Sequence, residues 1–176
     1  MNAPLIRVLA VDIGTSSVRA MVYDAAGTIH ARAQIAYATV RPAPYFEEQD
    51  PDLVRGEVYR AVALCLAQPG AEPARVAAIG FSSQMYGVIA LDAADRALTR
   101  NILWSDGRAE AQAEAIKQEF GARWLYPETG CPMNSIFPFA KLAWLRDEAP
   151  EIFGAARRFV SIKEYVTHPL IGTWAV

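Results

Sequence analysis

The sequence predicts an α/β fold, with a mixed sheet that opens with an antiparallel three-strand meander and has helices on both faces. The first observation is that three segments of strand character, residues 6–11, 18–23 and 28–37, follow one another with only tight turns between them. The second is that a helical stretch over residues 51–68 separates them from another short apolar segment, residues 76–81. Because a helical crossover commonly joins parallel strands, we expect this fourth strand beside the first.

Turn and capping residues support the order of these elements. Gly27 ends the turn over residues 24–27, where a hairpin connection requires unusual backbone angles. Asp50 can cap the first helix, and Pro51 suits its first helical position. The Pro-Gly pair at residues 69–70 stops this helix. Its apolar stripe consists of Leu53, Val54, Tyr59, Val62, Ala63 and Leu66.

The second half of the chain begins with two short strands, expected over residues 87–91 and 98–104. Asp106 can then cap a helix over residues 107–120, which Gly121 closes.

Helical patterns dominate from there on. A further helix is expected over residues 138–148. Its inward-facing residues are expected to be Phe139, Leu142, Ala143 and Leu145. A strand over residues 158–162 and a short helix over residues 163–170 complete the prediction.

Composition excludes several classes of protein. With 53% hydrophobic and 20% charged residues, the chain has a globular composition. A net charge of -2 leaves no basic excess for a nucleic-acid backbone, and no apolar run is long enough to span a bilayer, so neither partner is expected. Cys65 and Cys131 form no Cys-x-x-Cys pair, which favours reduced thiols in a cytoplasmic protein. We expect residues 1–176 to be one domain, truncated at Val176, because the chain ends without a stop signal.

The segment after the first strand has the residue types of a phosphate-binding loop. Asp12 stands at the carboxyl end of a buried strand, and Gly14 lets a backbone approach a bulky anion closely. The remaining candidate phosphate ligands are Thr15, Ser16, Ser17 and Arg19. A single acid beside such donors suits Mg²⁺, which prefers oxygen ligands and bridges phosphates. Judged by spacing alone, a plain polar hairpin turn with a solvated aspartate explains the segment equally well.

A family resemblance favours the phosphate reading. Residues 12–19 (DIGTSSVR) resemble the first phosphate motif of the FGGY carbohydrate kinases, which belong to the actin-like ATPase superfamily with its ribonuclease-H-like fold. Further similar segments follow in family order: residues 48–51 (EQDP), 80–85 (GFSSQM), 102–108 (ILWSDGR), 129–132 (TGCP), 141–145 (KLAWL) and 161–165 (SIKEY). Each motif is short, but their shared order and spacing over nearly the whole chain are specific.

The resemblance implies roles for individual residues and for two cofactors, ATP and Mg²⁺. Asp12 is expected near Mg²⁺ and the γ-phosphate. The expected phosphate ligands are Gly14, Thr15, Ser16, Ser17 and Arg19, and the expected sugar-side residues are Gln84, Met85, Tyr86, Trp104 and Asp106. Family members have the catalytic base in a second domain, which this chain lacks, so the chain alone is expected to fold without phosphorylating a sugar.

Plainer explanations exist for several of these residues. Trp104 also suits a packed core, and Met85 also suits ordinary packing. Asp106 also suits a pure helix cap. Tyr86 departs from the histidine that relatives often have at this point.

The sequence therefore supports a leading function and two alternatives. The leading one is ATP-dependent phosphorylation of a sugar or sugar acid, with gluconate first, for residues 162–165 and 81–83, and xylulose next, for residues 48–51 and the Gln84-Met85 pair. Arg108 is the one cation expected near the site that suits a substrate carboxylate. The alternatives are an actin-like nucleotide-binding module used in regulation or assembly, and an inactive remnant. The phosphorylated hydroxyl and the oligomeric state stay open, with a homodimer as one option.

Overall fold

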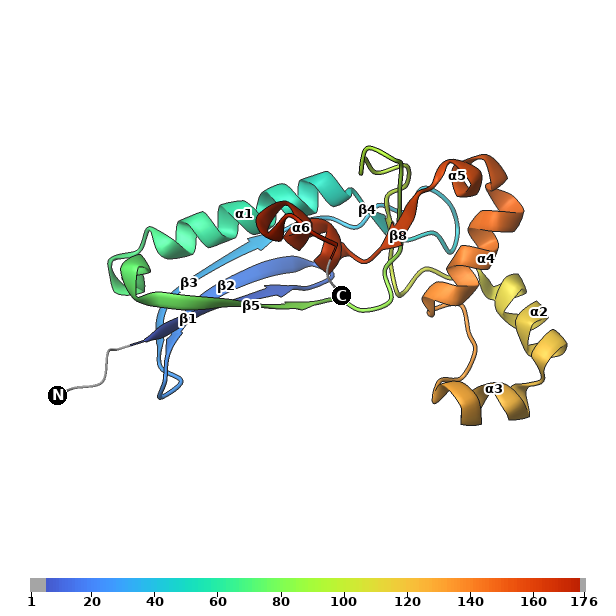
Figure 1. Ribbon diagram of the computed structural model, residues 1–176, viewed down its shortest axis with the longest axis horizontal. Coiled ribbons are helices and arrows are strands. Elements are labelled where there is room, and N and C mark those ends of the chain that lie inside the picture. Colours follow the sequence, from blue (N-terminus) through green and yellow to red (C-terminus); the bar gives the residue numbers. More distant parts are fainter. Residues whose placement is uncertain (1–5, 175–176) are drawn as a thin grey trace. The chain divides into compact units, whose positions relative to one another are not determined.

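The computed structural model describes residues 6–174, and these residues divide into two compact units (Figure 1). The first, here named the sheet unit, comprises Met1–Ala38, Asp52–Gln84 and Lys163–Val176. The second, here named the helical unit, comprises Thr39–Pro51 and Met85–Ile162.

The sheet unit is built on four strands in the order β3-β2-β1-β5. Strands β1 (Arg7–Ile13), β2 (Ser17–Asp24) and β3 (Ile29–Ala36) form the predicted antiparallel meander. Helix α1 (Pro51–Leu66) then leads to β5 (Val76–Ser83), which pairs with β1 in parallel. The mixed α/β sheet and its strand order are therefore confirmed.

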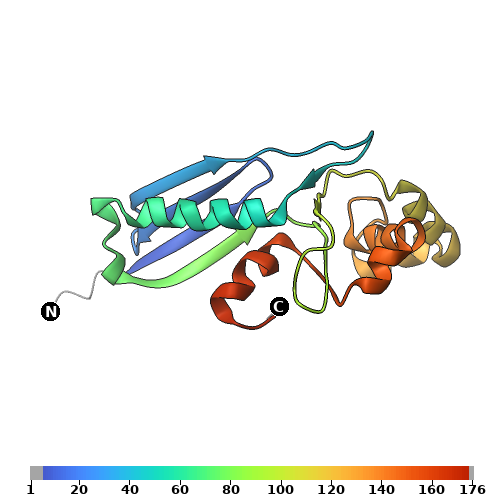
Figure 2. The ribbon, with the colours of Figure 1, turned by 90° about the horizontal axis from the view of Figure 1, so that it is seen from above.

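The core of the sheet unit lies between the sheet and α1. Leu9, Val11 and Ile13 alternate along β1 and are buried, as period-two side chains of a half-covered strand should be, and Val54 and Val58 of α1 are buried as well. Helix α1 runs across the strands on one face of the sheet (Figure 2). The burial of these side chains from both layers is what holds α1 on the sheet.

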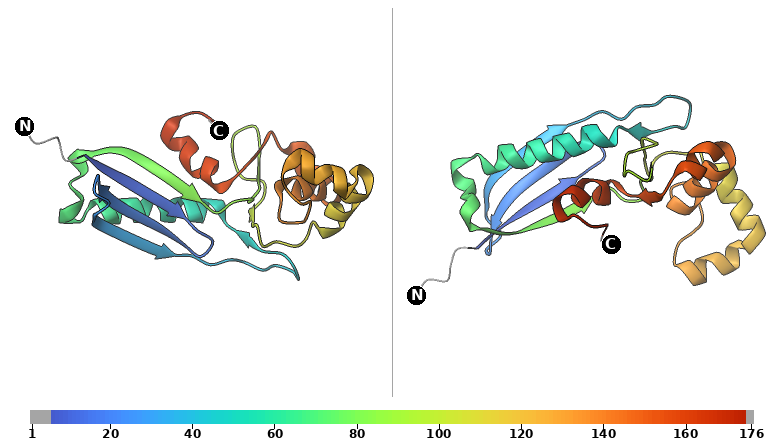
Figure 3. Two further views of the ribbon diagram at one scale, coloured as in Figure 1. Left: turned by 90° about the horizontal axis from the view of Figure 1, so that it is seen from below. Right: turned by 45° about the horizontal axis from the view of Figure 1, so that its top comes forward.

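Helix α6 (Ile162–Ile171) joins α1 on the same face (Figures 1 and 3). The hydroxyl of Tyr59 on α1 donates to the carbonyl of Val166 at 2.8 Å, and the hydroxyl of Tyr165 donates to the carboxylate of Asp52 at 2.6 Å. Among the described residues of the sheet unit, no helix covers the opposite face, so this unit by itself does not show the expected helices on both faces.

The helical unit contains two short antiparallel strand pairs. Strand β4 (Glu48–Gln49) pairs with β7 (Asn101–Ile102), and β6 (Ile89–Leu91) pairs with β8 (Arg158–Val160). The strands predicted over residues 87–91, 98–104 and 158–162 therefore exist, but they are shorter and lie outside the four-stranded sheet.

The helical unit also contains four helices: α2 (Glu110–Phe120), α3 (Ala122–Thr129), α4 (Pro138–Glu148) and α5 (Pro150–Ala155). The bounds of α4 match the prediction. The sequence pattern does not predict α3 and α5, because α3 contains a proline, which argues against a helix, and α5 is only 6 residues long.

Two details of these helices differ from what the sequence predicts. Helix α2 begins at Glu110, three residues later than predicted, and its N-cap position is Ala109, so Asp106 does not cap it. On α4 the expected inward residue Leu145 is buried, but Phe139 is 56% exposed and Lys141 is fully buried in its stead.

Two further expectations concern cysteines and membranes. Cys65 is buried and Cys131 is half-buried, and both are free thiols. Among the helices of residues 6–174, none has the length and apolar character that crossing a membrane requires.

Candidate functional site

The turn between β1 and β2 is fixed by its own backbone and by one tyrosine. The N–H of Gly14 donates to the carbonyl of Ser17 at 3.0 Å, which closes the turn. Tyr37 holds it from outside, because its N–H donates to the Ser16 carbonyl at 3.1 Å and its hydroxyl donates to the Gly14 carbonyl at 2.5 Å. Burial, and then the negative charge of Asp12, raise the pKa of Tyr37 above its ordinary value, so the phenol stays a neutral donor.

Gly14 has a different role from the expected one. A Cβ at this position would lie 3.0 Å from the Ser17 carbonyl oxygen, so the tight turn itself favours glycine. The Gly14 N–H is used inside the turn, and an anion cannot share it without opening the turn.

Asp12 and Arg19 stand opposite each other in the β1–β2 register. Their neighbours Val11, Ile13 and Val18 face the core, so alternation places both charged side chains on the uncovered face. Nη1 of Arg19 lies 3.0 Å from Oδ2 of Asp12, with the side chains 44% and 40% exposed. The carboxylate is therefore accessible, and an exposed pair of this kind is weak enough to be exchanged for a ligand.

The hydroxyl-bearing residues of the turn are not equivalent. Ser16 is exposed and Thr15 is half-buried. Ser17 is buried, and its hydroxyl accepts a hydrogen bond from Nε2 of Gln34 at 3.1 Å. Ser17 thus supports the turn, while Ser16 is the most accessible of the three.

The donor set fits the way that proteins hold Mg²⁺ beside a nucleotide. Among the described residues no group of three or more His, Cys, Asp or Glu side chains could hold a metal ion by itself. Mg²⁺ commonly keeps several waters and uses one or two carboxylates plus substrate phosphates. The accessible carboxylate of Asp12 at a strand end is a group of the kind that such a site uses.

Gln84 lies in the sheet unit, at the same sheet edge as the turn. Its N–H donates to the carbonyl of Ile13 at 2.7 Å and so extends the pairing of β5 with β1. The sheet unit therefore brings Gln84 together with Asp12 and the turn, because the carboxyl ends of parallel strands meet at one edge.

The other expected sugar-side residues belong to the helical unit. Met85 is 61% exposed and Trp104 is 45% exposed, so neither is a packed core residue. Tyr86 has a left-handed backbone with φ of 62°, and its ring contacts that of Phe137 with centroids 4.8 Å apart.

Asp106 is buried inside an ion-pair cluster. Its Oδ1 accepts from the backbone N–H and from Nε of Arg108 at 3.0 and 2.9 Å. Its Oδ2 accepts from the N–H of Glu47 at 2.6 Å and from Nη2 of Arg108 at 2.7 Å. With four donors on a residue that is 1% exposed, the carboxylate holds its own loop together.

Arg108 is the centre of the same cluster. Its Nη2 also lies 2.6 Å from Oε1 of Glu48, and its guanidinium stacks 3.8 Å from the ring centroid of Phe46 and 5.0 Å from that of Trp144. The side chain is 5% exposed. This pairing corrects the expectation that Arg108 binds a substrate carboxylate. The guanidinium already pairs with two carboxylates of the protein, those of Asp106 and Glu48.

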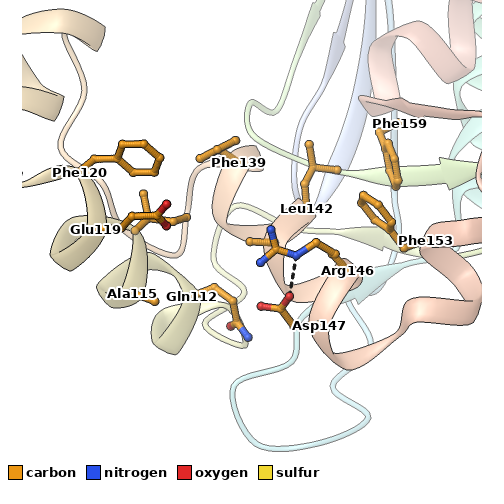
Figure 4. A pocket seen from close by; sticks show the side chains of 12 residues that line it. Gln112, Ala115, Glu119, Phe120, Phe139, Leu142, Arg146, Asp147, Phe153 and Phe159 are labelled. Atoms are coloured by element: carbon orange, nitrogen blue, oxygen red, sulfur yellow. Dashed lines mark hydrogen bonds and ion pairs between the residues drawn. The ribbon is translucent and has the colours of Figure 1, made fainter.

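A cavity of about 400 Å³ in the helical unit lies apart from these residues (Figure 4). It is lined mainly by apolar side chains of α2, α4, α5 and β8, including Phe120, Phe139, Leu142 and Phe159. None of the predicted site residues lines it, so we do not count it as part of the candidate site.

Residues 7–176 match the FGGY family of carbohydrate kinases, N-terminal domain. The chain belongs to this family. The gluconokinase of Bacillus licheniformis is 36% identical over 169 residues, which are 96% of this chain and 32% of that protein. The FGGY domain thus spans about a third of the length of its curated relative.

Solved structures of FGGY-type kinases agree with the fold. The gluconate kinase from Lactobacillus acidophilus superposes with a TM-score of 0.84 at 31% identity, over 93% of this chain and 33% of that one. The ligand-bound xylulose kinase from the same organism gives a TM-score of 0.85 at 31% identity, over 94% of this chain and 33% of that one. The fold class expected from the sequence is therefore confirmed.

Two residues of this FGGY domain, Tyr37 and Lys141, have structural roles that the sequence does not predict. Nζ of the fully buried Lys141 donates to the carbonyls of Tyr86 at 2.7 Å and Ile136 at 3.0 Å. The available signal was a lone lysine in the apolar motif of residues 141–145. Nothing local distinguishes Tyr37, whose partners are 21 and 23 positions earlier in the chain.

Burial lowers the pKa of Lys141 from 10.5 to about 8, while the nearby charge of Asp106 raises it and that of Arg108 lowers it. Between these two pH values the unfolded chain binds more protons than the folded one, so this group makes stability rise with pH. Between pH 8 and pH 10.5, we expect the free energy of unfolding of the wild type to increase by roughly 3 kcal/mol relative to that of the Lys141→Met variant. Urea unfolding of both proteins across this range measures the difference, and parallel curves would contradict the assignment.

Proposed function

We propose that the complete protein that carries this domain transfers the γ-phosphate of ATP to a hydroxyl group of a sugar or sugar acid. The observation that carries the proposal is the accessible carboxylate of Asp12 beside a turn whose backbone Tyr37 holds fixed. Phosphoryl transfer depends mainly on positioning and on neutralising charge, and a rigid turn with an adjacent carboxylate suits both tasks.

Each residue of the sheet-unit site has a distinct task in this proposal. Asp12 holds Mg²⁺, which when bound neutralises charge on the phosphate oxygens. Arg19, released from Asp12, donates to phosphate oxygens, and Thr15 and Ser16 add hydroxyl donors. The base that accepts the proton of the sugar hydroxyl lies outside this chain.

The helical unit supplies the sugar side in this proposal. An exposed indole such as that of Trp104 packs well against the C–H surface of a sugar, and Met85 and Tyr86 add apolar and hydroxyl contacts. Asp106 contributes by holding its loop, because its oxygens are already occupied. A nucleotide-binding module without sugar turnover has no use for the exposed Trp104 and Met85, so we do not favour that alternative.

Gluconate is the first substrate to test and xylulose the second. The 36% identity to a gluconokinase supports gluconate. The two Lactobacillus acidophilus structures are equally similar at 31% identity, which keeps xylulose in the proposal. Arg108 no longer argues for gluconate, since its guanidinium is paired internally.

A coupled assay of ADP release tests this proposal. The purified complete protein is given ATP and Mg²⁺ with gluconate, xylulose or no sugar. We expect sugar-dependent ADP release, fastest with gluconate. Release that ignores the added sugar would overturn the kinase proposal, and rapid turnover of xylulose without gluconate would reverse the order of substrates.

Replacing Trp104 with alanine tests the sugar side. We expect the KM for the sugar to rise about tenfold, because the aromatic contact with the sugar is lost, while the KM for ATP changes little. Trp124→Ala is the matched control, since Trp124 is similarly exposed at 53% and contacts Phe120 on the neighbouring helix. Equal changes in both KM values for Trp104→Ala, or equal effects of the two substitutions, would speak against a sugar contact.

A further inference from the structure

Lys141 is a charged residue at a buried position that an uncharged side chain of similar volume could fill. It is 0% exposed, and no ion pair to its ammonium is found within residues 6–174. Removing an ammonium from water is costly unless its N–H donors find acceptors, and here two carbonyl oxygens accept from two of its three donors. A methionine would fill similar space without that cost, so what distinguishes the lysine is its ability to bind these two carbonyls.

One of the two carbonyls belongs to the segment that the proposed function assigns to the sugar. Tyr86 has φ of 62°, a conformation that is uncommon for a residue with a large side chain and that persists only where the surroundings enforce it. The Lys141 ammonium is one contact that maintains this conformation, because its hydrogen bond of 2.7 Å fixes the direction of the Tyr86 carbonyl.

The surroundings fix the same segment on its other sides. The next residue, Gly87, lies so close to Asn101 that a Cβ on it would be 2.5 Å from the Asn101 carboxamide oxygen. The ring of Tyr86 rests against that of Phe137, and the second acceptor of Lys141 is the carbonyl of the preceding residue, Ile136. Lys141 on α4 therefore binds both the backbone of Tyr86 and the backbone next to Phe137, whose ring contacts the Tyr86 ring.

We infer that Lys141 is a positioning residue for the substrate, which acts by holding the Tyr86 carbonyl and so setting the directions of the Met85 and Tyr86 side chains. The inference rests on the proposed function. Lys141 itself is buried and does not touch the sugar. Its loss lets Tyr86 leave the left-handed conformation and move both side chains away from where the sugar binds.

The test uses Lys141→Met in the complete protein, with Lys117→Met as the matched control. Lys117 is a surface lysine of α2 that pairs with Glu114. We expect Lys141→Met to raise the KM for the sugar about tenfold or more, as fits the loss of a charge-assisted hydrogen bond, and to leave the KM for ATP within about twofold. Lys117→Met should change neither KM.

A second measurement separates this inference from the proposed function. Backbone hydrogen exchange of residues 85–87 should be faster in Lys141→Met than in the wild type, whether or not the protein phosphorylates a sugar. If the wild type turns over no sugar, the proposed function fails, and the exchange result alone decides whether Lys141 holds this segment. An active Lys141→Met with an unchanged KM for the sugar, or unchanged exchange at residues 85–87, overturns the inference. Should Lys141→Met not fold, Lys141→Gln is measured instead: its side chain is shorter and uncharged, so the same rise in the KM for the sugar and the same faster exchange are expected, and unchanged values overturn the inference.

Discussion

The Asp12→Asn substitution is expected to lower the turnover number of the complete protein about a thousandfold, or roughly 4 kcal/mol in the activation barrier. Asparagine has the same shape but no charge, so it cannot hold Mg²⁺ against the phosphates as a carboxylate does. Folding should be nearly unaffected, because Asp12 is 40% exposed and its contact with Arg19 is an exposed ion pair. Steady-state kinetics and thermal unfolding of the same sample measure both effects.

A closely matched control exists on α4. Asp147 is 38% exposed and pairs with Arg146 at 2.7 Å, so Asp147→Asn removes a similar charge from a similar pair away from the candidate site. We expect its turnover to equal that of the wild type. Near-wild-type turnover of Asp12→Asn would remove Asp12 from the proposed mechanism, and equal losses in the two variants would point to a general effect of charge.

The Arg108→Met substitution is expected to lower the free energy of unfolding by about 3 to 5 kcal/mol. Asp106 and Glu48 would lose their common cation while their side chains stay 0% and 15% exposed, and breaking a buried pair by removing one partner leaves uncompensated charge. The stacking of the guanidinium on Phe46 and Trp144 would be lost as well. Urea unfolding followed by circular dichroism measures the change.

Arg96→Met provides the comparison for this prediction. Arg96 also pairs with a carboxylate, that of Asp92 at 2.8 Å, but its side chain is 81% exposed. The expected loss is below about 1 kcal/mol. If Arg108→Met proved as stable as Arg96→Met and instead weakened gluconate binding selectively, then Arg108 would be a substrate ligand and its structural role would be disproved.

Local sequence patterns were sufficient to predict the sheet and the position of the turn between β1 and β2. Short strand-like runs separated by tight turns predict β1, β2 and β3, and strands joined by tight turns pair as neighbours. The continuous apolar run of β1 suggested burial on both faces, whereas its side chains are buried alternately. The Pro-initiated helix α1 then required a parallel fourth strand. Asp12 could be assigned to the strand end for the same reason, because its neighbours in the sequence determine where the strand ends.

The sequence could not reveal what the charged residues after Gln84 do. Arg108 and Asp106 looked like a substrate ligand and a helix cap, since their neighbours in the chain are compatible with both roles. Only the fold showed that Arg108 meets Glu48, 60 positions away. Asp106 lost its capping role because the chain uses its carboxylate to receive the N–H of Glu47, 59 positions away.

The sequence by itself determined the family, the order of the main strands and the strand end that carries Asp12, because each of these follows from residues that are close together in the chain. The tertiary structure decided which side chains are accessible to a ligand and which hold the protein together. Lys141 and Tyr86 are 55 positions apart, and whether a lysine binds a carbonyl or faces water depends on which segments folding brings together. Burial and charge pairing over such separations arise only when the chain folds, and local periodicity does not encode them.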